Sequence, residues 1–157
     1  PATLRRQRQM CIRDRNHLRW DSLGEFCALG ESLKFLAKTN NNPKAAVLGA
    51  AAESATQELL NNNKSPSRKV GEQDNRTSHF YFALYWAKAL AKQKQDPEIA
   101  KYFEPISKSL TENEDGIIKE IMELQGHEAD LGGYYHTDPV KVQKIMRPSK
   151  IFNQIIS

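Results

Sequence analysis

The chain bends at a long polar stretch, Lys64-Ser65-Pro66-Ser67-Arg68-Lys69-Val70-Gly71-Glu72-Gln73-Asp74-Asn75-Arg76, which separates two long helical patterns. Helices in compact domains are joined by roughly 2–8 residues, so this connection is longer than a simple turn requires. Four of its residues are Lys or Arg. Most runs of charge only face water, but a cluster of cations can also bind an anion. The sequence on either side has to decide between these two interpretations.

Two helices are predicted before the polar stretch. Asp21 or Ser22 can cap the first, whose apolar residues recur at helical spacing until about Lys38. Pro43 suits the first turn of the second helix, which runs to residues 61–63. Many alanines in the second helix, and glycines in both, allow the two helices to approach closely. We therefore expect them to form an antiparallel hairpin.

The helix predicted after the polar stretch is aromatic on nearly all sides. It begins at Thr77-Ser78 and continues to about Lys92. A helix that is apolar on most faces is buried on most faces. This is more buried surface than a small isolated domain usually needs, and it indicates that additional structure covers part of the helix.

Further helices are predicted in the second half of the chain. Asp96-Pro97 begins one of them, and Pro105 is expected to bend or end it. Thr111-Glu112-Asn113-Glu114 is typical of a capping box and predicts another helix, which stops at Gln125-Gly126. The acidic residues near this box are explained by the positive end of a helix, although they could also form a metal cluster.

The last part of the chain predicts short elements. Residues 130–135 predict a bend that enters a small extended segment, residues 139–146 a short helix, and residues 151–156 a final apolar turn or two. The predicted fold is therefore mainly α, with helical hairpins and a small extended segment near the C-terminus. A chain of 157 residues is long enough for one domain with a core.

The positive charge of the chain is concentrated at its beginning. The formal net charge is +4, yet residues 1–15 contain five arginines and one aspartate. The rest of the chain therefore holds 18 basic and 18 acidic residues. Nucleic-acid binding usually requires a basic face on the folded domain, and no such excess remains after residue 15. We predict no nucleic-acid partner.

We interpret residues 1–15 as a non-native leader. Met10-Cys11-Ile12-Arg13-Asp14-Arg15 back-translates into the transposon-end adaptor used in short-read library preparation, and Arg6-Gln7-Arg8-Gln9 into a repeat of its tail. The other interpretation is a genuine basic N-terminal arm. Codons that differ from the adaptor would contradict our interpretation, which leaves residues 16–157 for the analysis of the fold.

Several classes of protein lack support in the sequence. No apolar run approaches the roughly 20 residues of a membrane-spanning helix, and no signal-peptide pattern is present. Cys11 and Cys27 indicate neither a disulfide framework nor a metal site, so a reducing, cytoplasmic setting is expected. The four histidines are not spaced as zinc ligands are and are expected to be structural or exposed; they are His17, His79, His127 and His136.

Two arginines are candidates for anion binding. Arg19 lies just before the first predicted helix, and Arg68 lies in the polar stretch after the second. If the two helices form an antiparallel hairpin, both arginines lie at its open end. Two converging guanidinium groups would bind a phosphate with several hydrogen bonds. Two independent surface arginines explain the same residues equally well. Lys64, Lys69 and Arg76 are expected to be ordinary solvated residues.

Several unusual stretches occur along the sequence. They are Leu18-Arg19-Trp20-Asp21-Ser22-Leu23-Gly24-Glu25-Phe26, Asn62-Asn63-Lys64-Ser65-Pro66-Ser67-Arg68-Lys69-Val70-Gly71-Glu72, Asp74-Asn75-Arg76, Ser78-His79-Phe80-Tyr81, Gly132-Gly133-Tyr134-Tyr135 and Met146-Arg147-Pro148-Ser149. In their order and spacing, which cover about residues 16–157, they resemble one enzyme family, the monomeric-type NADP-dependent isocitrate dehydrogenases of bacteria. The resemblance corresponds to only the last fifth or so of a family chain.

The resemblance implies a parent enzyme that oxidises isocitrate to 2-oxoglutarate and CO2 and reduces NADP, with Mg2+ or Mn2+ as cofactor. It implies an α/β parent fold of the isocitrate/isopropylmalate dehydrogenase type and a monomer. The family's cofactor contacts map to Arg19, Asp21 and Arg68. An arginine beside the adenosine ribose suits a 2′-phosphate, and Asp21 could accept a hydrogen bond from a cofactor hydroxyl or orient an arginine.

The resemblance also implies what this chain lacks. The family's glycine-rich segment, metal ligands, substrate ligands and catalytic residues have no counterpart here, so we expect no catalytic or metal-binding residue in the chain. Hydride transfer requires substrate, metal and nicotinamide to be held together. We therefore expect the chain alone to have no dehydrogenase activity. The alternative hypothesis is a stand-alone helical module that binds phosphate or nucleic acid through the basic leader.

Overall fold

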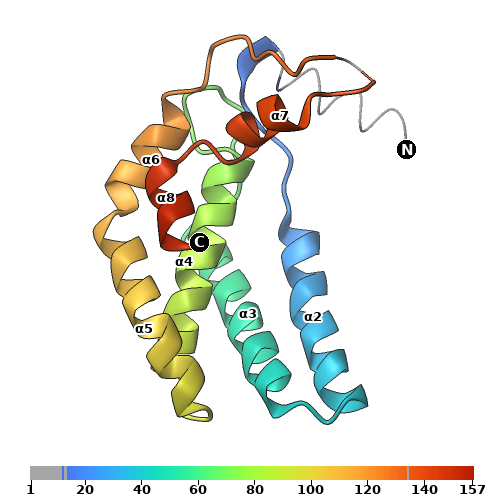
Figure 1. The fold of residues 1–157 in the computed structure, drawn as a ribbon, viewed down its shortest axis with the longest axis vertical. Helices are drawn as coiled ribbons and strands as arrows, with labels where there is room; N and C mark the ends of the chain where they lie inside the picture. The colour runs from blue at the N-terminus through green and yellow to red at the C-terminus, as the bar shows by residue number, and fades with distance from the viewer. Residues whose placement is uncertain (1–11, 13, 134) are drawn as a thin grey trace.

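The computed structural model describes residues 12, 14–133 and 135–157, and this part of the chain is helical with no strand (Figure 1). The expectation of a mainly α fold is confirmed. In chain order the helices are α2 (Leu23–Thr39), α3 (Pro43–Asn61), α4 (Asn75–Lys92), α5 (Pro97–Glu112), α6 (Glu114–Met122), α7 (Pro139–Met146) and α8 (Lys150–Ile155).

The four longest helices lie side by side in an antiparallel row, in the order α2, α3, α4 and α5 (Figure 1). Helix α6 continues upward from the end of α5, α7 lies across the top, and α8 returns beside α6 and the end of α5 (Figure 1). The N-terminal ends of α2 and α4 therefore meet at the same end of the row, next to the polar stretch. We call this the polar end of the molecule.

The hairpin of α2 and α3 is confirmed, and glycine makes it close. A Cβ placed on Gly49 would lie 3.0 Å from the carbonyl oxygen of Gly30 and 3.1 Å from the backbone nitrogen of Lys34. Real Cβ atoms rarely come this close to backbone atoms. The absence of a side chain at Gly49 therefore sets how closely the two helices approach.

Helix α4 lies at the centre of the core and has buried residues on most of its faces. The ring of Phe82 stacks on that of Phe26 in α2, with centroids 4.2 Å apart. The helix begins at Asn75, two residues before the predicted start. Asp74 caps it by accepting hydrogen bonds from the backbone N–H groups of Arg76 and Thr77, so the polar stretch already contains the first turn of the helix.

One predicted helix boundary, the capping box that begins at Thr111, is wrong. Pro105, which is expected to bend or end its helix, lies inside α5 without ending it, and both Pro105 and Lys101 are exposed. The carbonyl that loses its partner to the proline ring is therefore on the side that water can reach. Thr111 belongs to α5, where its hydroxyl donates to the carbonyl oxygen of Ser107 at 2.7 Å, and α6 begins without a side-chain cap. The capping-box pattern does not start a helix here.

The expected small extended segment is a closed turn. Asp138 donates its backbone N–H to the carbonyl oxygen of Leu131 at 2.8 Å. Gly132 has a φ of +78°, and a Cβ there would lie 2.6 Å from the Cβ of Asp138. The predicted bend is therefore present, but within residues 130–133 and 135–138 it leads to no strand.

A second, small hydrophobic cluster lies at the polar end. It joins the segment before α2 to the connection after α6 and to α7, and consists of Ile12, Leu18, Ala129, Leu131 and Ile145. The interpretation of residues 1–15 as a leader concerns mainly residues 1–11 and 13, which lie outside the described residues. That interpretation stays a prediction.

Candidate functional site

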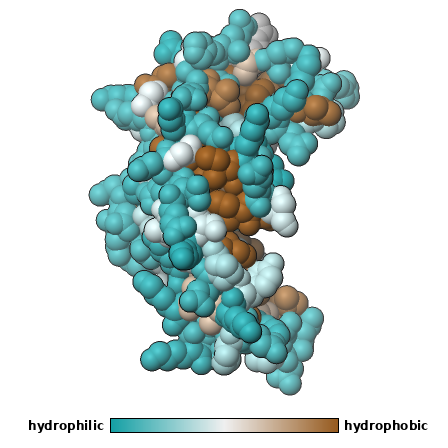
Figure 2. All heavy atoms as spheres, turned by 60° about the vertical axis from the view of Figure 1, so that its left-hand side comes forward, coloured by the Kyte–Doolittle hydropathy of each residue, from teal (hydrophilic) through white to brown (hydrophobic). Residues whose placement is uncertain are grey.

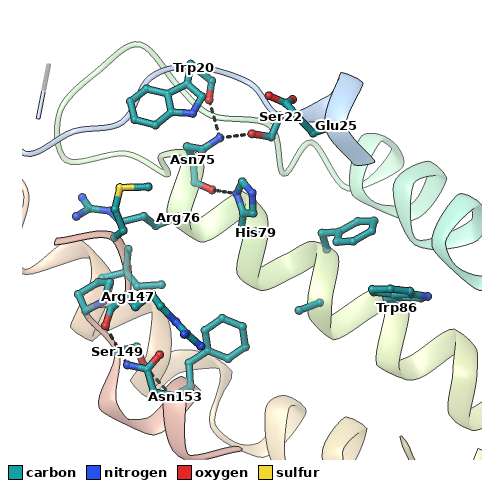
Figure 3. Close-up of a pocket in the computed structure, with 16 residues that line it drawn as sticks. Trp20, Ser22, Glu25, Asn75, Arg76, His79, Trp86, Arg147, Ser149 and Asn153 are labelled. Carbon is teal, nitrogen blue, oxygen red and sulfur yellow. Dashed lines mark hydrogen bonds between the residues drawn. The ribbon is translucent and has the colours of Figure 1, made fainter. Parts of the chain in front are cut away.

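Hydrogen bonds from the start of α4 hold the segment before α2. Leu18 donates its backbone N–H to the carboxylate of Asp74 at 3.3 Å, and its carbonyl accepts from the backbone N–H of Asn75 at 2.7 Å. The side-chain amide of Asn75 donates to the carbonyl oxygen of Trp20 and to the hydroxyl of Ser22, both at 2.9 Å (Figure 3). The segment is thus held at every second residue: by the backbone of Leu18 and Trp20 and by the side chain of Ser22.

The two residues between these attachment points are Arg19 and Asp21, and both are exposed. Asp21 accepts a hydrogen bond from the backbone N–H of Leu23 at 3.0 Å through one carboxylate oxygen. Alternating burial of this kind is typical of an extended chain held on one side. The arrangement presents a cation and a carboxylate to solvent from a fixed backbone.

The segment before α2 is also bonded to the polar stretch that carries Arg68. One ring nitrogen of His17 lies 2.8 Å from the carbonyl oxygen of Ser67, and the other lies 2.8 Å from the side-chain carbonyl of Gln125. Gln125 in turn accepts from the backbone N–H of Gly71 at 2.9 Å. His17 is buried, so its expected structural role is confirmed.

Arg19 and Arg68 therefore lie on two segments that are hydrogen-bonded to each other at the polar end. Both arginines are exposed. Neither guanidinium takes part in an ion pair or hydrogen bond within residues 12, 14–133 and 135–157. A guanidinium that is in no internal ion pair can bind a phosphate without first breaking one.

The other three cations of the polar stretch differ from one another. Lys64 lies over the ring of Tyr81, with its Nζ 4.0 Å from the ring centroid. Lys69 is exposed and lies 3.8 Å from the carboxylate of Glu72, as expected for a solvated residue. Arg76 is buried, with 4% of its surface exposed. The expectation that it is an ordinary solvated residue is therefore wrong.

The guanidinium of Arg76 joins three parts of the chain. It donates to Asp74 from Nε at 3.0 Å and from Nη2 at 2.6 Å, and to the backbone and side-chain oxygens of Asn16 at 2.7 and 2.9 Å. A fifth bond of 3.0 Å reaches the carbonyl oxygen of Ile145 in α7. Every N–H of the guanidinium thus has a partner, which is the condition under which a buried charge is tolerated.

A cavity of about 590 Å3 opens beside these residues, between the segment before α2, α4 and the start of α8 (Figure 3). Phe82, Trp86 and Phe152 form much of its apolar wall, and Arg147 lies at its polar side. Hydrophobic residues are also exposed between hydrophilic areas on the face shown in Figure 2. The cavity therefore presents mostly apolar surface next to an exposed cation.

Chemical groups for metal binding are sparse in the described chain. No group of three or more His, Cys, Asp or Glu side chains there has an arrangement that could hold a metal ion. A helix long and apolar enough to cross a membrane is likewise absent from the described residues. The three residues predicted to contact a cofactor, Arg19, Asp21 and Arg68, are all exposed at the polar end.

A family model described as monomeric isocitrate dehydrogenase matches residues 6–157, and the chain belongs to this family. Among its relatives, an isocitrate dehydrogenase [NADP] 2 of Psychrobacter sp. (strain 13A) is 54% identical over 92% of this chain. An isocitrate dehydrogenase [NADP] of Azotobacter vinelandii is 51% identical over 92%, and an isocitrate dehydrogenase [NADP] 2 of Mycobacterium tuberculosis 49% identical over 89%. The resemblance drawn from the sequence is confirmed.

The chain spans about a fifth of the length of these curated relatives, between 19% and 20%. The relatives lend no support to the alternative of a stand-alone module that binds phosphate or nucleic acid.

The sequence indicated the exposed arginines but not the roles of Asn75, Arg76 and Gln125, which hold their segments in place. The one available signal was the Asp-Asn-Arg sequence directly before an aromatic helix, where Asp74 could have been recognised as a cap.

Proposed function

We propose that this chain is the NADP-contacting, C-terminal portion of an isocitrate dehydrogenase. The parent enzyme would convert isocitrate and NADP into 2-oxoglutarate, CO2 and NADPH, in the cytoplasm and as a monomer. The proposal is supported by the family of the chain and by the names of its relatives. The observation that carries it is the exposed pair Arg19 and Arg68, on two mutually bonded segments and without internal ion pairs.

In this proposal Arg19 and Arg68 bind the 2′-phosphate that distinguishes NADP from NAD. A guanidinium supplies both charge and a planar pair of donors, which suits a phosphate. Asp21 uses one carboxylate oxygen for the N–H of Leu23. Its other oxygen can accept a hydrogen bond from a cofactor hydroxyl or orient an arginine.

The chain holds only part of the chemistry that the parent reaction requires. The family resemblance implies that the ligands of the expected Mg2+ or Mn2+ and of isocitrate belong to the rest of the parent enzyme. We propose that this rest also covers the apolar cavity beside α4 and α8. Residues 1–157 alone should produce no NADPH from isocitrate and Mg2+.

The test uses a completed chain, in which residues 16–157 replace the corresponding part of the Azotobacter vinelandii relative. Arg68→Ala removes one phosphate partner and leaves the backbone unchanged. We expect the Kd for NADP to rise about 10- to 100-fold, as for the loss of a charge-assisted hydrogen bond, while the Kd for NAD changes little. Calorimetric titration with each cofactor measures both values without requiring turnover.

Lys69→Ala is the matched control, because Lys69 is a neighbouring exposed cation paired with Glu72. It should leave the Kd for NADP within about twofold of the unsubstituted value, as is usual for exposed ion pairs. Equal effects of the two substitutions would indicate a general attraction by positive charge. An unchanged Kd in both Arg19→Ala and Arg68→Ala would contradict the proposed function.

A further inference from the structure

We infer that Asn75 is a positioning residue for the proposed phosphate site. Its side chain bonds both neighbours of Asp21, through the carbonyl of Trp20 and the hydroxyl of Ser22, and its backbone N–H bonds the residue before Arg19. Asn75 thereby fixes where Arg19 and Asp21 lie relative to the polar stretch. This inference rests on the proposed function, because it assigns Asn75 a role in NADP binding that acts through Arg19 and Asp21.

The geometry of the side-chain amide leaves little freedom. Nδ2 has two N–H groups, and the two acceptors at 2.9 Å are the carbonyl oxygen of Trp20 and the hydroxyl of Ser22. A carbonyl only accepts, so the amide orientation is fixed by its partner. Asn75 is 2% exposed, which means that water cannot readily replace these bonds. The backbone N–H of Asn75 adds a third bond, to Leu18 at 2.7 Å.

The hydroxyl of Ser22 bonds Asn75 and does not cap α2. Ser22 occupies the N-cap position of α2, where serine usually accepts from the backbone of the first turn. It makes no such side-chain bond. Its oxygen instead accepts from Asn75, while Asp21 bonds the N–H of Leu23. The start of α2 is therefore attached to the start of α4 through Asn75.

Loss of this amide would free the backbone that carries Arg19. The segment would keep its attachment at Leu18 but lose those at Trp20 and Ser22. A phosphate site is most effective when its cations are already held in place, because binding then requires little further ordering. NAD lacks the 2′-phosphate. The loss should therefore weaken the binding of NADP far more than that of NAD.

Asn75→Ala in the completed chain tests the inference. We expect the ratio of the Kd for NAD to the Kd for NADP to fall about tenfold, which is the scale of a misplaced binding group. In an Arg19→Ala background, Asn75→Ala should change this ratio little further, because the two residues act through one contact. Titration of the two single variants and the double variant with both cofactors completes the cycle.

Asn113→Ala is the matched control. Asn113 lies at the junction of α5 and α6 and donates one side-chain hydrogen bond of 2.9 Å, to Ser109. Its loss should lower the melting temperature and leave the cofactor ratio unchanged. If Asn75→Ala prevents folding, Ser22→Ala removes one of the two acceptors and keeps the amide in place. We expect that variant to lower the same ratio about threefold, as for one neutral hydrogen bond.

Failure of the inference and failure of the proposed function give different results. A lower melting temperature with an unchanged cofactor ratio in Asn75→Ala would overturn the inference, as would an unchanged ratio in Ser22→Ala. Additive effects of Arg19→Ala and Asn75→Ala would also contradict it, because independent sites add. If Arg19→Ala and Arg68→Ala both leave the affinity for NADP unchanged, the proposed function fails first. If the two arginine variants weaken NADP binding but Asn75→Ala leaves the cofactor ratio unchanged, only the role of Asn75 fails.

Discussion

The helical row and the polar end are held together by different interactions. In the row, α2 to α5 contact one another through alanine and aromatic side chains and, between α2 and α3, through the backbone at glycine. At the polar end, three segments distant in sequence meet around one buried guanidinium and a set of side-chain amides. Apolar contacts tolerate small shifts of position, whereas hydrogen bonds have strict geometry. The backbone positions at the polar end are therefore fixed mainly by hydrogen bonds, and those in the row mainly by packing.

The largest loss of stability should come from removing the buried guanidinium of Arg76 at the polar end. Arg76→Met keeps an unbranched, flexible stem but removes the guanidinium, which leaves the buried carboxylate of Asp74 without its cation. Removing one partner of a buried pair typically costs about 3–5 kcal/mol. We expect a loss of this size in the free energy of unfolding, measured by chemical denaturation followed by circular dichroism.

The control for this prediction is Lys69→Ala, which breaks an exposed ion pair in the same polar stretch. It should leave the denaturation midpoint unchanged. A similar loss of stability in both variants would show that the polar end depends on its overall charge. An unchanged midpoint in Arg76→Met would show that the buried contacts of the guanidinium contribute nothing net.

An intermediate effect should come from the closest contact in the row. Gly49→Ala places a methyl group against the backbone of Gly30 and Lys34. Forcing extra atoms into a well-packed contact costs about 1–3 kcal/mol. Thermal unfolding should therefore show a lower melting temperature for this variant, because α2 and α3 have to move apart.

Gly24→Ala provides the matched comparison, since Gly24 also lies in a helix of the hairpin but has no atom within 4 Å of an added Cβ. Alanine favours helices over glycine, so this variant should be at least as stable as the original chain. If both variants lower the melting temperature equally, the hairpin is not limited by the approach of its helices.

The smallest effect should appear only at high pH. Burial, with a contribution from a hydrogen bond to Glu114, raises the pKa of Tyr81 above its ordinary value of 10.0. The folded state thus holds this proton more tightly than the unfolded state, so stability is lost as the pH rises above about 10. Tyr81→Phe should flatten the dependence of the melting temperature on pH between about 9 and 11. Burial also raises the pKa of Tyr85, so some dependence should remain.

Local sequence patterns predicted the row well and the polar end poorly. Helices α2 and α3 follow from periodic apolar residues and from the break at Asn40–Pro43, which are features within a few residues of one another. Arg76 looked like a solvated cation because its partners Asn16 and Ile145 are 60 and 69 residues away. Burial of a charge depends on such distant partners, and no short window of sequence contains them.

Contacts between residues distant in the sequence also decide where helices end. Pro105 and the sequence around Thr111 both carry local signals for a boundary, yet α5 continues through them to Glu112. Contacts with α4 and α8 along the length of α5 outweigh the loss of one backbone hydrogen bond. Arg19 and Arg68 were identified because their family resemblance is carried by the residues themselves. The hairpin of α2 and α3 places their segments at the same end of the row, as the sequence predicts.

The position of α2 at the edge of the row has a consequence for hydrogen exchange. Phe26 and Gly30 are its only buried residues among those described, whereas α4 is buried along its length. Amide protons of α2 should therefore exchange with deuterium well before those of α4, as one locally opening unit. Arg19 lies just before α2, whereas Arg68 lies in the polar stretch, outside this unit. A ligand bound by both arginines would therefore oppose the opening of α2. Slower hydrogen exchange of the α2 amides would report that the ligand is bound.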